Sequence, residues 1–148
     1  MKLTATARSI VLLTALSFAA HAADLTWLTD MSKALDTAKT QKKSVLINFT
    51  GSDWCGYCKK LESEVFQTKE FADYAEKNLV LVKADFPRRT EQPAQLKTAN
   101  AALKTKYAEP FKGFPTLVLV DAAGKKLGQT VGYGPGSGPK ALLKELDG

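Results

Sequence analysis

The sequence is poor in the side chains that most often bind metal ions, because it has one histidine and two cysteines among 148 residues. The histidine, His21, lies in an N-terminal segment that we expect to be removed. A structural zinc site usually needs four cysteine or histidine ligands, which one copy of this chain does not supply. We therefore expect no metal and no cofactor, and a zinc site would require two copies to share their four thiols.

Long apolar runs are also scarce. The clearest one, Ser9 to Ala20, has the length of the apolar part of a signal peptide and is too short to cross a bilayer. Basic residues precede it, and small residues follow at the two positions that a signal peptidase inspects. We expect Met1 to Ala22 to be a secretory signal. No stop-transfer charges follow the run, which argues against a retained membrane anchor.

Removal of these 22 residues from 148 would leave 126, enough for one domain with its own hydrophobic core. The formal net charge would fall from +6 to +4, because the segment holds two basic and no acidic residues. The remaining lysines and arginines are spread along the chain, which argues against nucleic-acid binding. The glycine-rich segment 132–138 lacks the Lys-Ser/Thr pair of a phosphate-binding P-loop.

Hydrophobic periodicity predicts a chain in which helices and strands alternate. The expected helices span residues 30–41, 55–66, 69–78, 94–107 and 140–146, and the expected strands span residues 44–49, 79–85, 116–120 and 126–133. The last two strands follow each other closely, as in a hairpin. This order favours an α/β fold with a central mixed β-sheet and helices on both of its faces.

The two cysteines stand three positions apart in the segment GSDWCGYCKKL, Gly51 to Leu61. A structural disulfide is disfavoured, because such a short loop constrains the unfolded chain least. Covalent haem attachment requires a histidine after the second cysteine, and Lys59 stands there. Redox chemistry needs only the two sulfurs in this spacing.

The expected local structure favours this redox hypothesis. If a helix begins at Cys55, its unpaired amides and the positive end of its dipole favour the thiolate form of this residue. Only the thiolate attacks a disulfide. Cys58 would then lie one turn further, with Lys59 and Lys60 adding positive charge. We therefore predict that Cys55 is the accessible nucleophile and that Cys58 is shielded.

Two separate segments resemble the thioredoxin superfamily, in particular its small exported, periplasmic members related to disulfide isomerases. The first is Phe49 to Lys59, with Trp54 directly before Cys55, and the second is GFPTLVLVD, Gly113 to Asp121. The resemblance implies the thioredoxin fold over residues 23–148. It also implies a cis bond before Pro115, with Thr116 following it. Two further positions match family features: Gly132, where the backbone passes close to the site, and Lys83, a buried lysine of the central strand.

The chain also departs from the family pattern. Thioredoxins bury an aspartate beneath the second cysteine, and Asn48 stands at the matching position, where it accepts no proton. A proton acceptor would then be water, Lys83, or a carboxylate such as Asp53 or Glu62, unless Asn48 only binds backbone groups. The pair Gly56-Tyr57 resembles periplasmic disulfide isomerases, whereas Phe114 before the proline departs from both groups.

Several aromatic residues are candidates for an apolar rim around the sulfurs, namely Trp54, Tyr57, Phe111 and Phe114, although some of them are equally suited to the core. Phe66, Phe71 and Tyr74 fit core positions. The pair Arg88-Arg89 is expected to be solvated charge on a loop.

The expected function is an exported thiol–disulfide oxidoreductase that reduces or isomerises protein disulfides through Cys55 and Cys58. Its partners would be substrate proteins and an electron donor, with no nucleic acid and no stable membrane insertion, and we expect a monomer. The competing hypothesis is a non-catalytic binding module whose disulfide stays permanently closed.

Overall fold

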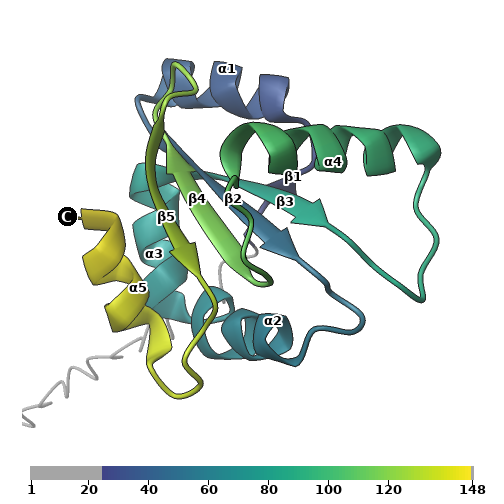
Figure 1. Cartoon of the computed structure of the whole chain (residues 1–148). Helices are drawn as coiled ribbons and strands as arrows, with labels where there is room; N and C mark the ends of the chain where they lie inside the picture. The colour runs from purple at the N-terminus through teal and green to yellow at the C-terminus, as the bar shows by residue number, and fades with distance from the viewer. Residues whose placement is uncertain (1–24, 148) are drawn as a thin grey trace, which may run out of the picture.

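The computed structural model describes residues 25–147, so the expected signal segment lies outside the described residues. A five-stranded sheet forms the centre of the molecule, in the order β1-β3-β2-β4-β5 (Figure 1). The strands are β1 (Trp27–Leu28), β2 (Ser44–Thr50), β3 (Leu79–Asp85), β4 (Thr116–Val120) and β5 (Lys126–Val131). β1, β3 and β2 are parallel, and β4 and β5 run antiparallel to their neighbours. The sheet is therefore mixed, as expected.

Helices cover both faces of this sheet. They are α1 (Met31–Gln41), α2 (Gly56–Leu61), the π-helical turn η1 (Glu62–Phe66), α3 (Lys69–Asn78), α4 (Ala94–Tyr107) and α5 (Gly138–Asp147). Figure 1 shows α1 and α4 on one side of the sheet and α2, α3 and α5 on the other. The expected thioredoxin-type layering is confirmed.

The strand β2 shows why the chain adopts this layered structure. Its residues 45–50 are all buried, and successive side chains point to opposite faces. Ile47 and Phe49 pack with α1 and α4, whereas Leu46 packs with α2, α3 and α5. A continuous apolar strand of this kind is typical of a sheet that is covered on both sides.

Helix starts follow the sequence closely. The carboxylate of Asp30 accepts the backbone N–H of Lys33 at the start of α1, and Thr68 caps α3 in the same way through the N–H of Phe71.

The strand expected over 126–133 ends earlier, at Val131, and the last helix begins at Gly138 instead of residue 140. Two features were not expected: β1, which at two residues is too short to show periodicity, and the π-helical turn that extends α2.

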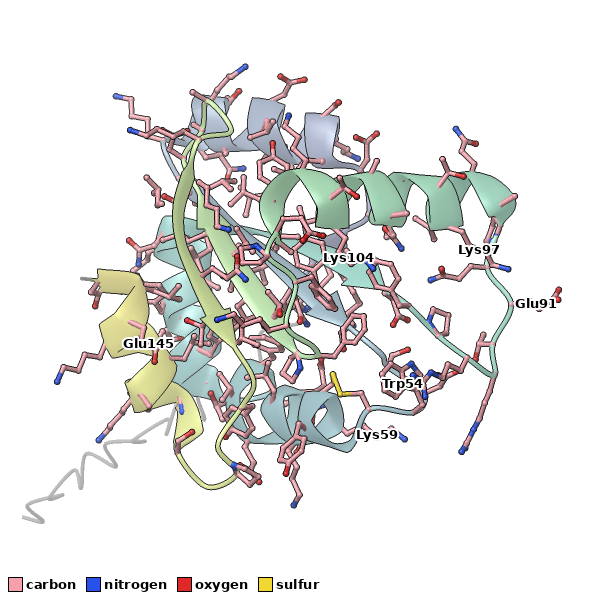
Figure 2. The ribbon with its side chains drawn as sticks, in the orientation of Figure 1. Trp54, Lys59, Glu91, Lys97, Lys104 and Glu145 are labelled. Atoms are coloured by element: carbon pink, nitrogen blue, oxygen red, sulfur yellow. A yellow bond between two sulfur atoms is a disulfide. The ribbon has the colours of Figure 1, made fainter. Side chains whose placement is uncertain are left out.

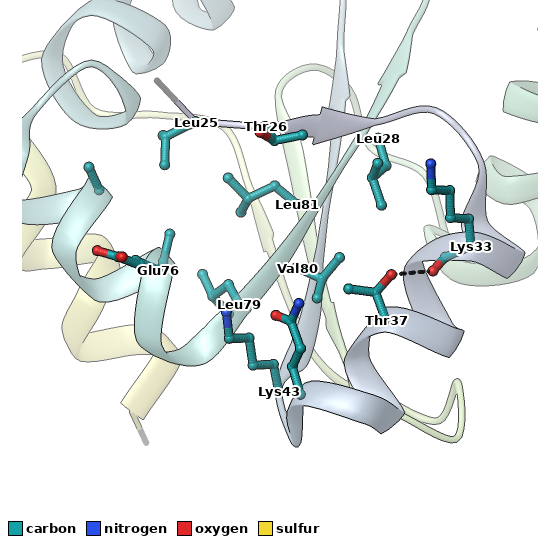
Figure 3. A pocket seen from close by; sticks show the side chains of 13 residues that line it. Leu25, Thr26, Leu28, Lys33, Thr37, Lys43, Glu76, Leu79, Val80 and Leu81 are labelled. Carbon is teal, nitrogen blue, oxygen red and sulfur yellow. Dashed lines mark hydrogen bonds between the residues drawn. The ribbon is translucent and has the colours of Figure 1, made fainter. Parts of the chain in front are cut away.

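A hollow of about 510 Å³ lies between α1 and α3, beside β1 (Figure 3). Lys43, Leu79 and Val80 line it at the amino ends of β2 and β3. Cys55 follows the carboxyl end of β2, so the hollow lies at the other end of the sheet from the cysteines. Within residues 25–147, no helix combines the length and the apolar character needed to span a bilayer.

The two-layer core predicts a difference between two leucines. Leu46 is fully buried in β2, whereas Leu127 is 54% exposed on β5. Leu46→Ala should lower the free energy of unfolding by about 2–5 kcal/mol. The matched change Leu127→Ala should cost about 0.5 kcal/mol or less. Urea denaturation of both variants measures the difference, and equal losses would contradict this placement of β2.

Candidate active site

The turn from β2 to α2 brings the two cysteines together. The backbone N–H groups of Trp54 and Cys55 both donate to the carbonyl oxygen of Gly51, at 3.2 and 2.8 Å. This turn places Cys55 at the N-cap of α2, where its Sγ accepts the backbone N–H of Cys58 at 3.2 Å. Cys55 and Cys58 form a disulfide bond.

Exposure does not separate the two cysteines in this disulfide form. Cys55 is 6% exposed and Cys58 is 5% exposed, so the expected excess exposure of Cys55 is absent here. The difference lies in their positions on the helix, because Cys55 caps its first turn and Cys58 lies within it. Gly56, Tyr57 and Lys59 are exposed around the disulfide.

Trp54 lies directly beside the disulfide (Figure 2). Its indole Nε1–H donates to the carbonyl oxygen of Phe86 at 2.8 Å. A Cβ atom at Gly51 would lie 2.5 Å from the indole ring, so a larger residue there would displace Trp54. Glycine at position 51 therefore allows the tryptophan to pack against the turn.

An aromatic cluster extends from this tryptophan. Its members are Trp54, Phe86, Phe111 and Phe114, with ring centroids 4.9 to 5.5 Å apart in each contacting pair. All four are partly exposed. Trp54, Phe111 and Phe114 are thus in contact and partly exposed, as a rim requires, whereas Tyr57, at 58% exposure, belongs to no aromatic pair among residues 25–147.

The second motif packs against the first through Phe114. The Phe114–Pro115 bond is cis, as expected, and a further cis bond, Glu109–Pro110, was not expected. The N–H of Gly132 donates to the carbonyl oxygen of Pro115 at 2.8 Å, which agrees with the expected approach of the Gly132 backbone. Thr116 is fully buried, and its hydroxyl donates to the carbonyl oxygen of Gly113.

Glu64 anchors the glycine-rich loop that follows β5. Its carboxylate accepts the Tyr133 hydroxyl at 2.8 Å and the N–H of Gly136 at 2.7 Å. The Gly136 hydrogen bond, and then that of Tyr133, lowers the pKa of Glu64, while burial and this carboxylate raise the pKa of Tyr133. The loop begins at Gly132, so the anchor connects η1 to the backbone beside Pro115.

Asn48 lies on the sheet face that α2 covers. It is 3% exposed, pairs in register with Lys83 of β3, and its Oδ1 has no hydrogen-bond partner among residues 25–147. Lys83 is only half-buried, in contrast to the family's buried lysine, and its Nζ lies 3.9 Å from a carboxylate oxygen of Glu62. Two of the candidate proton acceptors, Lys83 and Glu62, therefore form an ion pair with each other on the α2 side of the sheet.

Asp53, another candidate proton acceptor, binds backbone N–H groups of the loop that follows β3. Its carboxylate accepts the backbone N–H groups of Arg88, Arg89 and Thr90 at 2.8 to 3.0 Å. The hydrogen bond from Arg88 is the largest cause that lowers its pKa to about 2, against some opposing desolvation. Asp53 thus holds the loop that follows β3 against the turn before the disulfide.

The expectation that Arg88 is only a solvated charge on this loop is wrong. Arg88 is exposed, but its guanidinium lies over the Trp54 ring, 3.6 Å from the ring centroid, so it is more than a solvated charge. Sequence reasoning missed Arg88 and Phe86 as neighbours of the disulfide. The only signal was the aromatic and basic residues directly after the carboxyl end of β3, the end at which the neighbouring parallel strand β2 leads to Cys55.

The thioredoxin-like domain model matches residues 31–147. The chain belongs to the thioredoxin-like family. It is 39% identical over 123 residues to the disulfide bond reductase DsbH of Chlamydia pneumoniae. The aligned region covers 83% of this chain and 72% of the relative. A match at this level and over this length is evidence of common descent across the domain.

Solved structures of related proteins agree with this family assignment. The structure of a DsbH oxidoreductase superposes with a TM-score of 0.75 at 32% identity, covering 96% of this chain and 92% of that one. A disulphide isomerase from Xylella fastidiosa gives a TM-score of 0.56 at 25% identity, over 74% and 81% of the two chains. Together with the family match, these relatives show that the protein is a thiol–disulfide oxidoreductase.

The hydrogen bonds of Asp53 predict a pH dependence. Its pKa is lowered in the folded state, so its contribution to stability is complete above the unfolded value of about 3.8 and is lost as the pH falls towards 2. Asp53→Asn should lower the melting temperature at pH 7 and flatten its fall between about pH 4 and 2. Circular dichroism melts measure this.

The matched control is Asp36→Asn, on the exposed face of α1. It should leave the melting temperature at pH 7 nearly unchanged. If Asp53→Asn melts with the same pH profile as the unaltered protein, the carboxylate does not hold the loop.

Proposed function

We propose that the protein is an exported reductase of protein disulfides, with Cys55 as the nucleophile and Cys58 as the resolving thiol. The observation that carries the proposal is the position of Cys55 at the N-cap of α2, where its Sγ accepts the backbone N–H of Cys58. In the reduced protein the same amide and the helix dipole stabilise a Cys55 thiolate. Lys59 and Lys60 add positive charge in the last turn of α2.

The reaction takes place in two exchanges. The Cys55 thiolate attacks one sulfur of the substrate disulfide, which forms a mixed disulfide and releases the first substrate thiolate. Cys58 then loses its proton and attacks the Sγ of Cys55, which closes the Cys55–Cys58 disulfide and releases the second substrate thiolate. Two protons complete the two substrate thiols. The protein is oxidised by two electrons, so a separate electron donor must reduce it again.

The second exchange requires a proton acceptor for Cys58. Asn48 takes up no proton, and the Asp53 carboxylate already accepts three backbone N–H groups. The Glu62–Lys83 pair, on the α2 side of the sheet, and water remain as acceptors.

The docking edge for the substrate is the backbone at Phe114. Its N–H and C=O have no backbone partner among residues 25–147, whereas Pro115 is already bonded to Gly132. An extended substrate segment gains affinity by pairing with such free backbone groups. Phe114 also contacts Trp54, so a segment bound at this edge lies beside the disulfide.

Reduction is favoured over strong oxidation by the residues between the cysteines. Gly56 and Tyr57 carry no charge that would stabilise the Cys55 thiolate further, and a strongly stabilised thiolate makes a disulfide a strong oxidant. The similarity to a relative named as a disulfide bond reductase supports the same direction. Isomerisation shares the first exchange and differs in that a substrate thiol, instead of Cys58, resolves the mixed disulfide.

The division of roles predicts different trapping by two variants. Cys58→Ala should keep the nucleophile and lose the resolving thiol, so mixed disulfides with substrate proteins should accumulate. Cys55→Ala should trap at least about tenfold less, because Cys58 lies within the helix, away from its positive end. Non-reducing gels of cell extracts, with reductant added as the control, measure both. Equal trapping by the two variants would contradict the assignment of the nucleophile.

The direction of exchange predicts a reduction potential. Equilibration with glutathione should give a value below about −200 mV, closer to thioredoxin at about −270 mV than to a strong oxidant at about −120 mV. The reduced protein should also reduce insulin. A disulfide that no physiological reductant opens would support the binding module instead, and a potential near −120 mV would make the protein an oxidant.

A further inference from the structure

A cation lies on the tryptophan beside the disulfide. The guanidinium carbon of Arg88 is 3.6 Å from the centroid of the Trp54 ring. The side chain is exposed, and its N–H groups have no hydrogen-bond or ion-pair partner among residues 25–147. Arg88 therefore presents free donors at the edge of the surface where a substrate segment would bind.

Two hydrogen bonds position the backbone that carries this guanidinium. The Asp53 carboxylate holds the backbone N–H of Arg88, and the Trp54 indole donates to the backbone of Phe86, two residues earlier. An arginine whose ring contact and backbone are already set loses less conformational entropy when it binds a ligand. The Arg88 side chain thus resembles a pre-organised binding group more than a mobile surface charge.

Two more cations lie in this region, one at the aromatic cluster and one near the disulfide. Lys104 reaches from α4, with its Nζ 5.4 Å from the Phe86 ring and 5.0 Å from the Phe111 ring. Lys59 lies on the opposite side of the disulfide from α4 (Figure 2). Neither forms an ion pair within the part of the chain that the structure describes.

The acidic groups near this surface keep their negative charge, but none of them forms an ion pair with Arg88, Lys59 or Lys104 among residues 25–147. The Asp53 carboxylate is occupied by three backbone N–H groups, and that of Glu109 accepts the N–H of Phe111. Glu91 lies at the outer bend of the loop after β3, away from the disulfide (Figure 2). The Arg88 guanidinium, beside the aromatic cluster, is therefore free to bind a carboxylate of an acidic polypeptide segment.

We propose that Arg88 determines substrate specificity by binding a carboxylate of the substrate segment, so that disulfides flanked by Asp or Glu are reduced faster than those flanked by Lys or Arg. The planar guanidinium suits this task, because its parallel N–H groups bind both oxygens of a carboxylate. The proposal rests on the proposed function, and Arg88 takes no part in the bond changes at sulfur.

The contacts also indicate where the carboxylate lies. Trp54 contacts both groups: its ring centroid is 3.6 Å from the guanidinium carbon of Arg88 and 5.5 Å from the ring centroid of Phe114. An extended chain advances about 3.3 Å per residue. The acidic residue of the substrate is therefore expected within about three residues of the one that pairs with the Phe114 backbone.

The experiment compares two disulfide-containing peptides that differ only at these flanking positions, with Glu in one and Lys in the other. The pre-reduced protein is mixed with each peptide in a stopped-flow instrument, and the second-order rate constant of a single exchange is measured at low and at high salt. No further reductant is needed, because two protein thiols reduce one peptide disulfide. The ratio of the two rate constants is the readout, since a general loss of activity cancels in it.

The unaltered protein should reduce the Glu peptide about three- to tenfold faster at low salt, and the ratio should fall as salt screens the charges. Arg88→Gln should reduce the ratio at least twofold, and Arg88→Lys, which keeps the charge without the planar fork, should lie between. Lys97→Gln, the same loss of charge near the start of α4 and away from the disulfide (Figure 2), should leave the ratio unchanged.

Three results would overturn the proposal: a ratio near one, a ratio that Arg88→Gln leaves intact, or an equal fall in Lys97→Gln, which would indicate net charge alone. Each of these leaves the proposed function standing, because both peptides are still reduced. Failure to exchange with either peptide would instead contradict the proposed function, and this proposal with it.

Discussion

The five residues from Gly51 to Cys55 carry the constraint on which the site depends. Within these five residues the chain must leave a largely buried strand, turn, and begin a helix with a sulfur at its N-cap. The carbonyl oxygen of Gly51 makes the turn by accepting two backbone N–H groups, and the missing side chain of Gly51 leaves room for the Trp54 indole. The turn positions Cys55 for its hydrogen bond from the Cys58 amide.

The same turn also connects the cysteines to the rest of the fold. Asp53 points to the loop after β3, and Trp54 contacts Phe114 in the segment before β4. Because β2 lies between β3 and β4 in the sheet, neighbours on both sides reach this one turn. Contacts from three distant parts of the sequence thus meet beside one disulfide.

Much of this arrangement follows from local sequence signals. The buried strands β2, β3 and β4 are short apolar runs, and α1 and α3 begin at side-chain caps, so the observed positions of these elements agree with the sequence prediction within about two residues. The cysteine spacing and the segment around Pro115 indicated the thioredoxin fold and the site. These signals are local, since each depends on residues close together in the chain.

What remained unpredicted depends on contacts between distant residues. Nothing in the local sequence of Asp53 indicates that its carboxylate accepts N–H groups 35 to 37 residues away. Arg88 has the sequence context of a solvated loop, and only the fold places it on Trp54. The two-residue strand β1 exists because β3 offers a free edge, and two residues show no period of their own.

This division has a consequence for how the protein can change. The chemistry of the sulfurs depends on the start of α2, whereas the groups that would distinguish one substrate from another lie on the loop after β3 and on α4. The loop joins the site through backbone groups that Asp53 and Trp54 bind, and these bonds do not depend on which side chains the loop carries. Substitutions at Arg88 or Arg89 can therefore alter the charge that faces a substrate while the geometry at Cys55 stays the same.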